Sequence, residues 1–186
     1  FRNAGASASL EIGLLLSQLA ESLSEDISTV RIQTGVGPDY FGEIAKIRAL
    51  RSASLQVADE MGWNGSFEIA AVPSSYYLSS KEVNTNILRQ TTMCMSAILG
   101  GVDIVFCTPF NFEESNFASR ISNNIQIVLE QESYLSQIID PAHGAYFIEN
   151  QTNKILEKGW GKFQNIESEG GFSDCLKGDV VYRKID

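Results

Sequence analysis

Few side chains in this sequence have the type and spacing that catalysis or metal binding requires. His143 is the only histidine, and it stands in a turn-like stretch with no second imidazole or cysteine close by. A single histidine forms neither a zinc site nor a Ser-His-Asp triad, so we expect His143 to be a loop or surface residue. The three cysteines, Cys94, Cys107 and Cys175, have no C-x-x-C spacing and lie in or beside apolar runs. We therefore expect small, buried, reduced thiols rather than metal ligands or a nucleophile.

The other charged residues indicate structural roles. Glu113 and Glu114 fall in the expected first turn of a helix, where the helix dipole favours negative charge, and Glu130 and Glu132 fall near a helix end. Neither pair suggests paired acid–base work. Four arginines lie within expected helices, where surface ion pairs are the default interpretation and the last two could instead contact a partner: Arg48, Arg51, Arg89 and Arg120.

Residues 35–51, GVGPDYFGEIAKIRALR, place two glycines between an expected strand and an expected helix, as a phosphate-binding loop would. A dinucleotide-binding loop requires G-x-G-x-x-G, whereas the third glycine here, Gly42, is misplaced. The acidic Asp39 also sits where phosphate needs bare amide groups. We interpret Gly35 and Gly37 as allowing a tight turn, with Asp39 capping the helix that follows.

Composition restricts the class of protein. The chain has 186 residues, 44% of them hydrophobic, which suits roughly one domain with its own core. Its formal net charge of −9 argues against binding to nucleic acid or to an anionic membrane. We identify neither a signal-like segment nor an apolar run long enough to cross a bilayer, and reduced thiols suit a cytoplasmic location. Because the first residue is Phe1 rather than methionine, we expect a piece of a longer polypeptide.

Strand and helix patterns alternate along the chain. Strands are predicted at residues 29–35, 67–72 and 102–107, with centres roughly 35 residues apart, and the third is apolar enough to be buried on both faces. Spacings of three and four between apolar residues predict five helices, of which the third begins at a Ser79–Glu82 capping box and stops at Gly100-Gly101: residues 10–23, 40–61, 79–99, 117–128 and 152–169.

This rhythm predicts successive right-handed βαβ units and a parallel sheet. Three strands with four long helices make an awkward closed unit, and their number suits a sector of a (β/α)8 barrel, which takes about 250 residues. An isolated sector would leave two sheet edges exposed, so we expect something else to complete it.

Barrel enzymes place their chemistry at the C-terminal ends of the strands. Here those ends are QTG, AVPS and FCTP, without a histidine, carboxylate, lysine or arginine. A general acid or base is therefore missing from the expected active face. Ser74 and Thr108 are the best remaining polar candidates for the mouth of a pocket, and hydrogen bonds within turns are the alternative role for both.

Several segments now identify a family. GVGPDYFGEIAKIRALR resembles the G-x-G-x-N/D-F/Y-F-x-E-I/V-A-K-L/I-R-A segment of the methylmalonyl-CoA mutase family. Four further segments agree with family motifs in the same order, and the match extends to about Gly171: FRNAGASASLEIG, NTNILRQTTMCMSAILGGVDIVFCTPF, SRISNNIQIVLEQES and DPAHGAYFIENQT. Five ordered motifs at family spacing are a specific signal.

The resemblance implies an α/β fold that is the C-terminal half of a (β/α)8 TIM-type barrel, with residues 1–171 in the barrel domain and 172–186 starting a tail or linker. In active family members the barrel holds acyl-CoA along its axis beneath adenosylcobalamin. Cobalt–carbon homolysis then yields an adenosyl radical that abstracts hydrogen, and the carbon skeleton rearranges between methylmalonyl-CoA and succinyl-CoA.

Departures from the family pattern refine this expectation. Active chains carry Phe-His-x-Gln-Thr on the strand aligned with residues 69–73, whose polar pair is replaced here by Ala70 and Val72. On the next strand they have His-Thr-Asn-Ser where this chain has CTPF, and the glutamate before their Ala-Gly-Ala is Asn3. The cobalamin-binding D-x-H-x-x-G motif is absent, because Asp140 and His143 have the wrong spacing and His143 replaces a family glycine.

These departures resemble the small subunit of heterodimeric bacterial mutases. The resemblance implies no catalytic residue in this chain, adenosylcobalamin bound by the partner, and a supporting role beside a catalytic large subunit in propionate metabolism. Two alternatives stay open: a segment of a catalytic acyl-CoA mutase whose active-site residues lie outside this span, and a free-standing α/β binding module.

Overall fold

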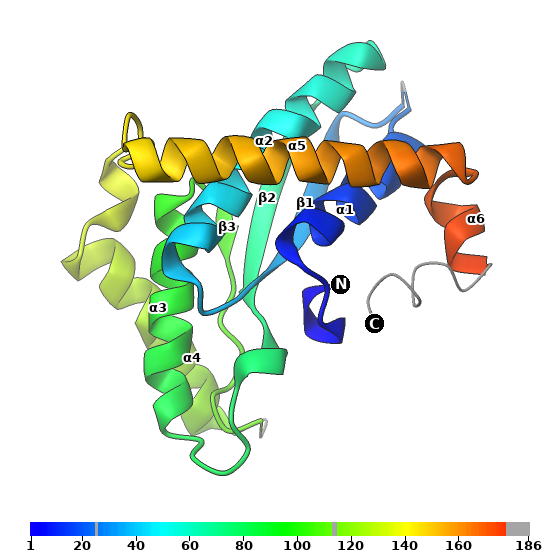
Figure 1. The fold of residues 1–186 in the computed structure, drawn as a ribbon. Coiled ribbons are helices and arrows are strands. Elements are labelled where there is room, and N and C mark those ends of the chain that lie inside the picture. The colour runs from blue at the N-terminus through cyan, green and yellow to red at the C-terminus, as the bar shows by residue number, and fades with distance from the viewer. Residues whose placement is uncertain (25, 113–114, 178–186) are drawn as a thin grey trace.

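The computed structural model describes residues 1–24, 26–112 and 115–177 (Figure 1). Three parallel strands, β1 (Thr29–Val36), β2 (Ser66–Pro73) and β3 (Ile104–Val105), form one sheet in the order β1-β2-β3. Six α-helices lie within these residues: α1 (Ala8–Ser22), α2 (Tyr40–Glu60), α3 (Thr85–Leu99), α4 (Asn116–Ile127), α5 (Tyr146–Ser168) and α6 (Gly171–Lys177). The prediction of an α/β chain with a parallel sheet is confirmed.

Side-chain caps fix where three of the helices begin. Ser7, Asp39 and Ser115 each accept a hydrogen bond from the backbone N–H three residues later, at 3.2–3.3 Å. Such a cap satisfies one of the four N–H groups that a helix start leaves without an intrahelical partner. The predicted role of Asp39 is therefore confirmed.

The helices cover one face of the sheet. Along β1, Ile32, Thr34 and Val36 are buried toward α1, α2 and α3, whereas Arg31 and Gln33 are exposed on the opposite face. The register pairs Arg31 with Glu68, so these two side chains lie on the same open face, whereas Ala70, the partner of Gln33, is only 1% exposed. Arg31 donates to Glu68 at 2.9 Å on that face, where the two side chains are 56% and 41% exposed.

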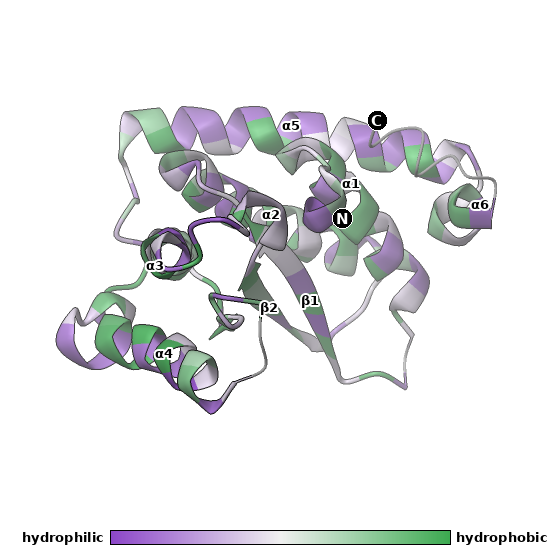
Figure 2. Cartoon of the chain, turned by 90° about the horizontal axis from the view of Figure 1, so that it is seen from below, coloured by the Kyte–Doolittle hydropathy of each residue, from purple (hydrophilic) through white to green (hydrophobic). Residues whose placement is uncertain are grey.

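Helix α5 forms a further layer over α1 and α2 (Figure 1). Helix α1 therefore lies between the sheet and α5, and its residues 10–17 are all buried. Figure 2 shows the corresponding pattern, with α1 mostly hydrophobic and α5 alternating between hydrophobic and hydrophilic segments. A helix that is apolar on all sides is typical of such an enclosed position.

Strand β3 is shorter than the predicted strand at residues 102–107, which was expected to be buried on both faces. It pairs with β2 only at Ile104 and Val105, both half-buried, and Phe106 beyond it is 47% exposed. The physical reason is its position, because β3 is the outermost strand of the described sheet and has a neighbour on one side only.

The prediction that a capping box at Ser79 and Glu82 starts the third helix is wrong. Ser79 Oγ does accept from the N–H groups of Lys81 and Glu82, both at 3.2 Å, but α3 begins only at Thr85. Buried Asn86 explains the delay, because its side chain binds both the N–H and the carbonyl of Ser79 at 2.9 Å and so folds residues 79–85 into a loop. The predicted stop at Gly100-Gly101 is confirmed.

The C-terminal part also departs from expectation. Helix α5 starts at Tyr146, six residues earlier than the periodicity predicted, and ends at the expected glycine pair. Helix α6 begins at Gly171, the last residue of the predicted barrel domain, and continues into the predicted tail, and its Cys175 packs with Leu10 and Leu14 of α1. Glu130 and Glu132 are exposed near the end of α4 as expected, whereas Glu113 and Glu114 lie outside the described residues. Within the described ranges, no helix combines the length and apolar character needed to cross a membrane.

Candidate functional site

A cluster of charged side chains is buried at the C-terminal end of β1. Lys46 of α2 places its Nζ 3.0 Å from Glu11 Oε2 of α1 and 2.6 Å from Glu43 Oε2, one helical turn earlier in α2. All three side chains are 0–2% exposed. Arg2 joins them through Glu43 Oε1 at 3.0 Å. We call Arg2, Glu11, Glu43 and Lys46 the buried ion cluster.

Arg2 closes the cluster on the side of the loop after β2. Its Nη1 donates to the carbonyl of Ala6 at 2.8 Å, which fixes the chain entering α1. Its guanidinium carbon lies 5.4 Å from the centre of the Tyr77 ring, a cation–π contact. Arg2 therefore connects the start of the chain to both α2 and the segment that follows β2.

The cluster also forms hydrogen bonds to the backbone of β1. Gly35 donates its N–H to Glu11 Oε1 at 2.9 Å, and its carbonyl accepts a hydrogen bond from Lys46 Nζ. A Cβ added at Gly35 would meet Arg2 Cβ at 2.4 Å, and one added at Gly37 would meet the Arg2 guanidinium at 2.9 Å. The two glycines were predicted to allow a tight turn. Gly35 is instead part of β1, and both glycines make room for Arg2.

The chemistry available to this cluster is limited by its internal pairing. Two cations face two carboxylates, so each buried charge has a partner of opposite sign. Buried ions are tolerated only when they are paired and hydrogen-bonded in this way. The arrangement fastens α1, β1 and α2 to one another, and it presents no unpaired carboxylate or amine that could act as a general acid or base.

The residues at the strand ends did not predict this cluster, because its charged side chains belong to helices rather than to strands. The signal in the sequence was a charged residue inside an apolar run. Glu11 stands between Leu10 and Ile12, and Lys46 stands between Ala45 and Ile47.

Ser74, one of the two predicted pocket residues, is not open to solvent. It is 1% exposed, and its hydroxyl donates to Asn3 Oδ1 at 2.8 Å. The same amide oxygen accepts the N–H of Ser75 at 3.1 Å. Asn3 therefore holds the loop after β2, and the structure brings Asn3 and Ser74 together.

Thr108, the other predicted pocket residue, follows β3 and is half-buried. Its carbonyl accepts a 2.7 Å hydrogen bond from Ser122 of α4. This contact ties the C-terminal end of β3 to α4 through the backbone of Thr108. Ser74 through its hydroxyl and Thr108 through its carbonyl thus make hydrogen bonds to segments distant in the sequence.

His143 lies at the surface, as predicted, with a side chain that is 83% exposed. Its Nδ1 is 3.8 Å from Asp140 and 3.9 Å from Glu149, the two carboxylates that bind Arg48 at 3.0 and 2.8 Å. The hydrogen bond from Arg48, followed by one from the N–H of Gly144, lowers the pKa of Glu149 to about 2. Arg48 and these carboxylates join α2 to the loop before α5, with Arg48 only 13% exposed.

The other arginines have local partners. Arg51 binds Asp103 at 2.6 Å ahead of β3, and Arg89 donates to Thr85 and Asn86 within α3. Arg120 lies over the ring of Phe117, 5.7 Å from its centre. In the described part of the chain, no three histidine, cysteine or acidic side chains are grouped so that they could hold a metal ion.

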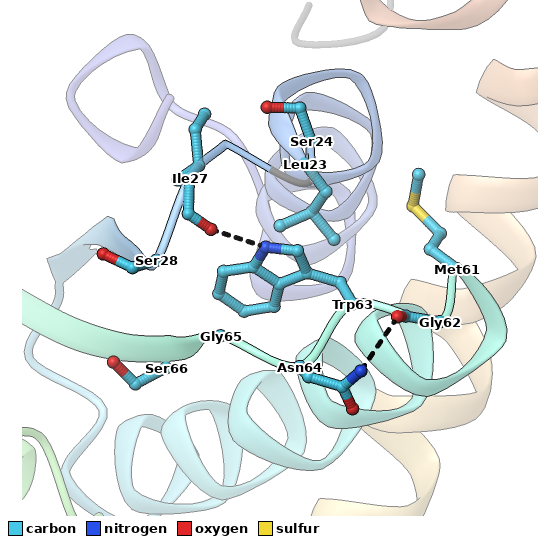
Figure 3. Close-up of a pocket in the computed structure, with 10 residues that line it drawn as sticks. All are labelled: Leu23, Ser24, Ile27, Ser28, Met61, Gly62, Trp63, Asn64, Gly65 and Ser66. Carbon is cyan, nitrogen blue, oxygen red and sulfur yellow. Dashed lines mark hydrogen bonds between the residues drawn. The ribbon is translucent and has the colours of Figure 1, made fainter.

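A cavity lies at the opposite end of the sheet, where β1 and β2 begin (Figure 3). It has a volume of about 800 Å³, and Trp63 spans it by donating its indole N–H to the carbonyl of Ile27 at 2.8 Å. The described residues that line it carry hydroxyl, amide and apolar groups: Leu23, Ser24, Ile27, Ser28, Met61, Gly62, Trp63, Asn64, Gly65 and Ser66. Among these ten residues there is neither an acid–base pair nor a charged anchor for a phosphate.

Comparison with known proteins relates the whole chain to one family. A family model described as methylmalonyl-CoA mutase matches residues 1–186. The chain is 32% identical to the methylmalonyl-CoA mutase small subunit of Porphyromonas gingivalis, over 99% of this chain and 33% of that protein. It is 31% identical to the small subunit of Streptomyces virginiae, over 100% of this chain and 32% of the relative.

The chain is also similar to proteins named methylmalonyl-CoA mutase without a subunit designation. The methylmalonyl-CoA mutase of Escherichia coli is 26% identical over 96% of this chain and 25% of its own length. The chain spans about a third of the length of its small-subunit relatives.

Proposed function

Because the chain belongs to the methylmalonyl-CoA mutase family, we propose that it is a segment of the small subunit of a methylmalonyl-CoA mutase. That enzyme interconverts methylmalonyl-CoA and succinyl-CoA. In this proposal the segment forms the second half of a (β/α)8 barrel and supports a catalytic large subunit, and it does not itself perform the rearrangement.

The observation that carries the proposal is the pairing of charges at the C-terminal end of β1. This end of the strands is where a barrel enzyme needs its acid, base or anchoring groups. Here Arg2, Glu11, Glu43 and Lys46 neutralise one another inside the protein. Ser74 is likewise bound to Asn3. These five side chains are therefore engaged within the protein, which supports a structural rather than a catalytic role for them.

One-sided helix packing supports the barrel part of the proposal. A doubly wound sheet carries helices on both faces, whereas a barrel carries them only on its outside. In this chain α1, α2 and α3 pack against the same face of the sheet, and Arg31 and Gln33 on the other face are exposed. Closure of the barrel would turn this open face toward the axis and would pair the free edges of β1 and β3 with further strands.

The described residues do not fit adenosylcobalamin as a bound cofactor. His143 is the only imidazole in the sequence, and it lies in the loop before α5, where its Nδ1 is within 4 Å of two carboxylates. We therefore assign adenosylcobalamin to the partner chain. The cobalt–carbon bond of this cofactor supplies the radical. No step of the reaction is assigned to a residue of this chain.

The remaining parts of the proposal follow from the same role. The direct partner is the catalytic large subunit of a heterodimer, and acyl-CoA is bound by the complex. The acidic composition offers no nucleic-acid surface, and a cytoplasmic location suits an enzyme that acts on CoA esters with reduced cysteines.

A reconstitution experiment tests the proposal at the level of residues. The full-length chain is titrated into purified large subunit with adenosylcobalamin and methylmalonyl-CoA, and turnover should rise and saturate near one chain per large subunit. A Ser74→Ala/Thr108→Ala variant should reach a saturating kcat within about twofold of wild type, whereas loss of a catalytic acid or base costs about 100-fold or more. A loss of that size, with normal binding to the large subunit, would show that this chain supplies catalytic groups.

A further inference from the structure

Two of the three cysteines touch each other behind the outermost strand. Cys94 belongs to α3, and Cys107 follows β3 by two residues. Their Sγ atoms are 2.9 Å apart and share one hydrogen bond, so both are present as thiols. Neither residue takes part in the buried ion cluster or in the contact between Ser74 and Asn3.

The surroundings hold the two thiols together. Cys94 is 1% exposed and packs with Ile125 and Leu129 of the α4 region, and Cys107 and Leu135 are partly buried against the same cluster. A disulfide has an S–S length of about 2.05 Å, so the two sulfur atoms need to approach by less than about 1 Å. Three elements that are already packed therefore place the pair close to bonding distance.

We propose that Cys94 and Cys107 are a redox modification site and form a reversible disulfide between α3 and the C-terminal end of β3. The oxidant is a low-molecular-weight disulfide of the glutathione type. The Cys107 thiolate attacks it, which forms a mixed disulfide and releases one glutathione thiolate. The Cys94 thiolate then attacks the Cys107 sulfur and releases the second glutathione thiolate, and the two thiol protons pass to the released thiolates. Two protein thiols are oxidised and one disulfide is reduced.

The local chemistry sets the order of these steps. The hydrogen bond with Cys107, and after it burial, raises the pKa of Cys94 above the ordinary thiol value. Since only the thiolate is nucleophilic, buried Cys94 is a poor first attacker. Half-buried Cys107 is therefore the point of entry, and Cys94 resolves the mixed disulfide in a slower second step.

The crosslink would close the segment that contains Gly100, Gly101 and β3. It would anchor the short outer strand, which pairs with β2 at only two residues, to the helix behind it. Thr108, next to Cys107, would be held with it. Constraining this loop in the unfolded chain is expected to raise the midpoint of thermal unfolding by roughly 5 °C or more.

The third cysteine provides an internal control. Cys175 of α6 is buried in a separate cluster with Leu10, Leu14 and Ile166, where its thiol donates to the carbonyl of Ile166 at 3.8 Å. Nothing in the contact between Cys94 and Cys107 involves this cluster. Oxidation of the folded protein should therefore leave Cys175 as a thiol.

The test uses the native full-length chain in glutathione buffers of increasing oxidised fraction, followed by alkylation, digestion and mass spectrometry. We expect a peptide pair joined through Cys94 and Cys107 with the loss of two hydrogens, reversal by dithiothreitol, and alkylated Cys175. Cys94→Ser should stop at glutathione bound to Cys107, and Cys175→Ser should form the crosslink normally. The oxidised wild-type chain should melt at the higher temperature.

Two results would overturn the proposal. One is that residues 94 and 107 remain alkylated at a redox poise that fully oxidises the urea-unfolded chain. The other is that Cys107 pairs with a residue other than Cys94. Both are measured on the wild-type chain, so they do not depend on whether a cysteine variant folds.

Discussion

Replacing Lys46 by methionine should destabilise the protein by about 3 kcal/mol or more. The Lys46 side chain is fully buried and contacts two carboxylates at 2.6 and 3.0 Å. Removing one partner of a buried ion pair typically costs about 3–5 kcal/mol, because a charge is left without compensation. Glu43 would keep its bond to Arg2, which favours the lower end of that range. Methionine retains the length of the lysine stem, so a cavity adds little.

The assay is urea unfolding of the full-length chain, followed by far-UV circular dichroism. The matched control is Lys154→Met on the exposed side of α5, which should change stability by less than about 0.5 kcal/mol. A Lys46→Met/Glu11→Gln variant should recover part of the loss, since glutamine still accepts from the N–H of Gly35 without carrying a charge. The reasoning would be refuted if Lys46→Met unfolded at the same urea concentration as the control.

Three further outcomes follow from other contacts. NMR titration should give Glu149 a pKa of about 2, and Arg48→Met should move it up toward the ordinary 4.5. Because the pKa of Glu149 is lowered in the folded state, the stability contributed by the contact between Arg48 and Glu149 is present above about pH 4.5 and is lost as the pH falls toward 2. This loss should be seen in the wild-type protein and not in Arg48→Met. Gly35→Ala should lower the free energy of unfolding by about 2 kcal/mol or more, because a Cβ at this position has no room. Gly161→Ala has open space in α5 and should raise the free energy of unfolding by about 0.5–1 kcal/mol. Urea unfolding measures both changes. Ser74→Ala should lower the unfolding free energy by about 1 kcal/mol in the same assay through loss of one buried hydrogen bond.

Local patterns in the sequence were sufficient to predict the alternation of strands and helices. Apolar runs around Ile32, Ile69 and Ile104 gave three strands, and glycine pairs marked the ends of α3 and α5 correctly. Asp39 was recognised as a cap because capping depends on residues three positions apart. Each of these features is set by neighbours along the chain.

Features decided by tertiary contacts were not predictable in this way. The length of β3 depends on which strands lie beside it, and the start of α3 depends on buried Asn86 binding the loop before it. The buried ion cluster joins Arg2 and Glu11 to charges in α2, tens of residues away in the sequence. Periodicity within one element cannot show that such residues meet.

Turnover by the isolated full-length chain tests the central claim most directly. The chain is supplied with methylmalonyl-CoA and adenosylcobalamin, and succinyl-CoA is measured with and without the large subunit. The account predicts no turnover above background for the chain alone and full activity once the large subunit is added. Succinyl-CoA formation by the chain alone, at a rate comparable to that of the complex, would contradict a supporting, non-catalytic role.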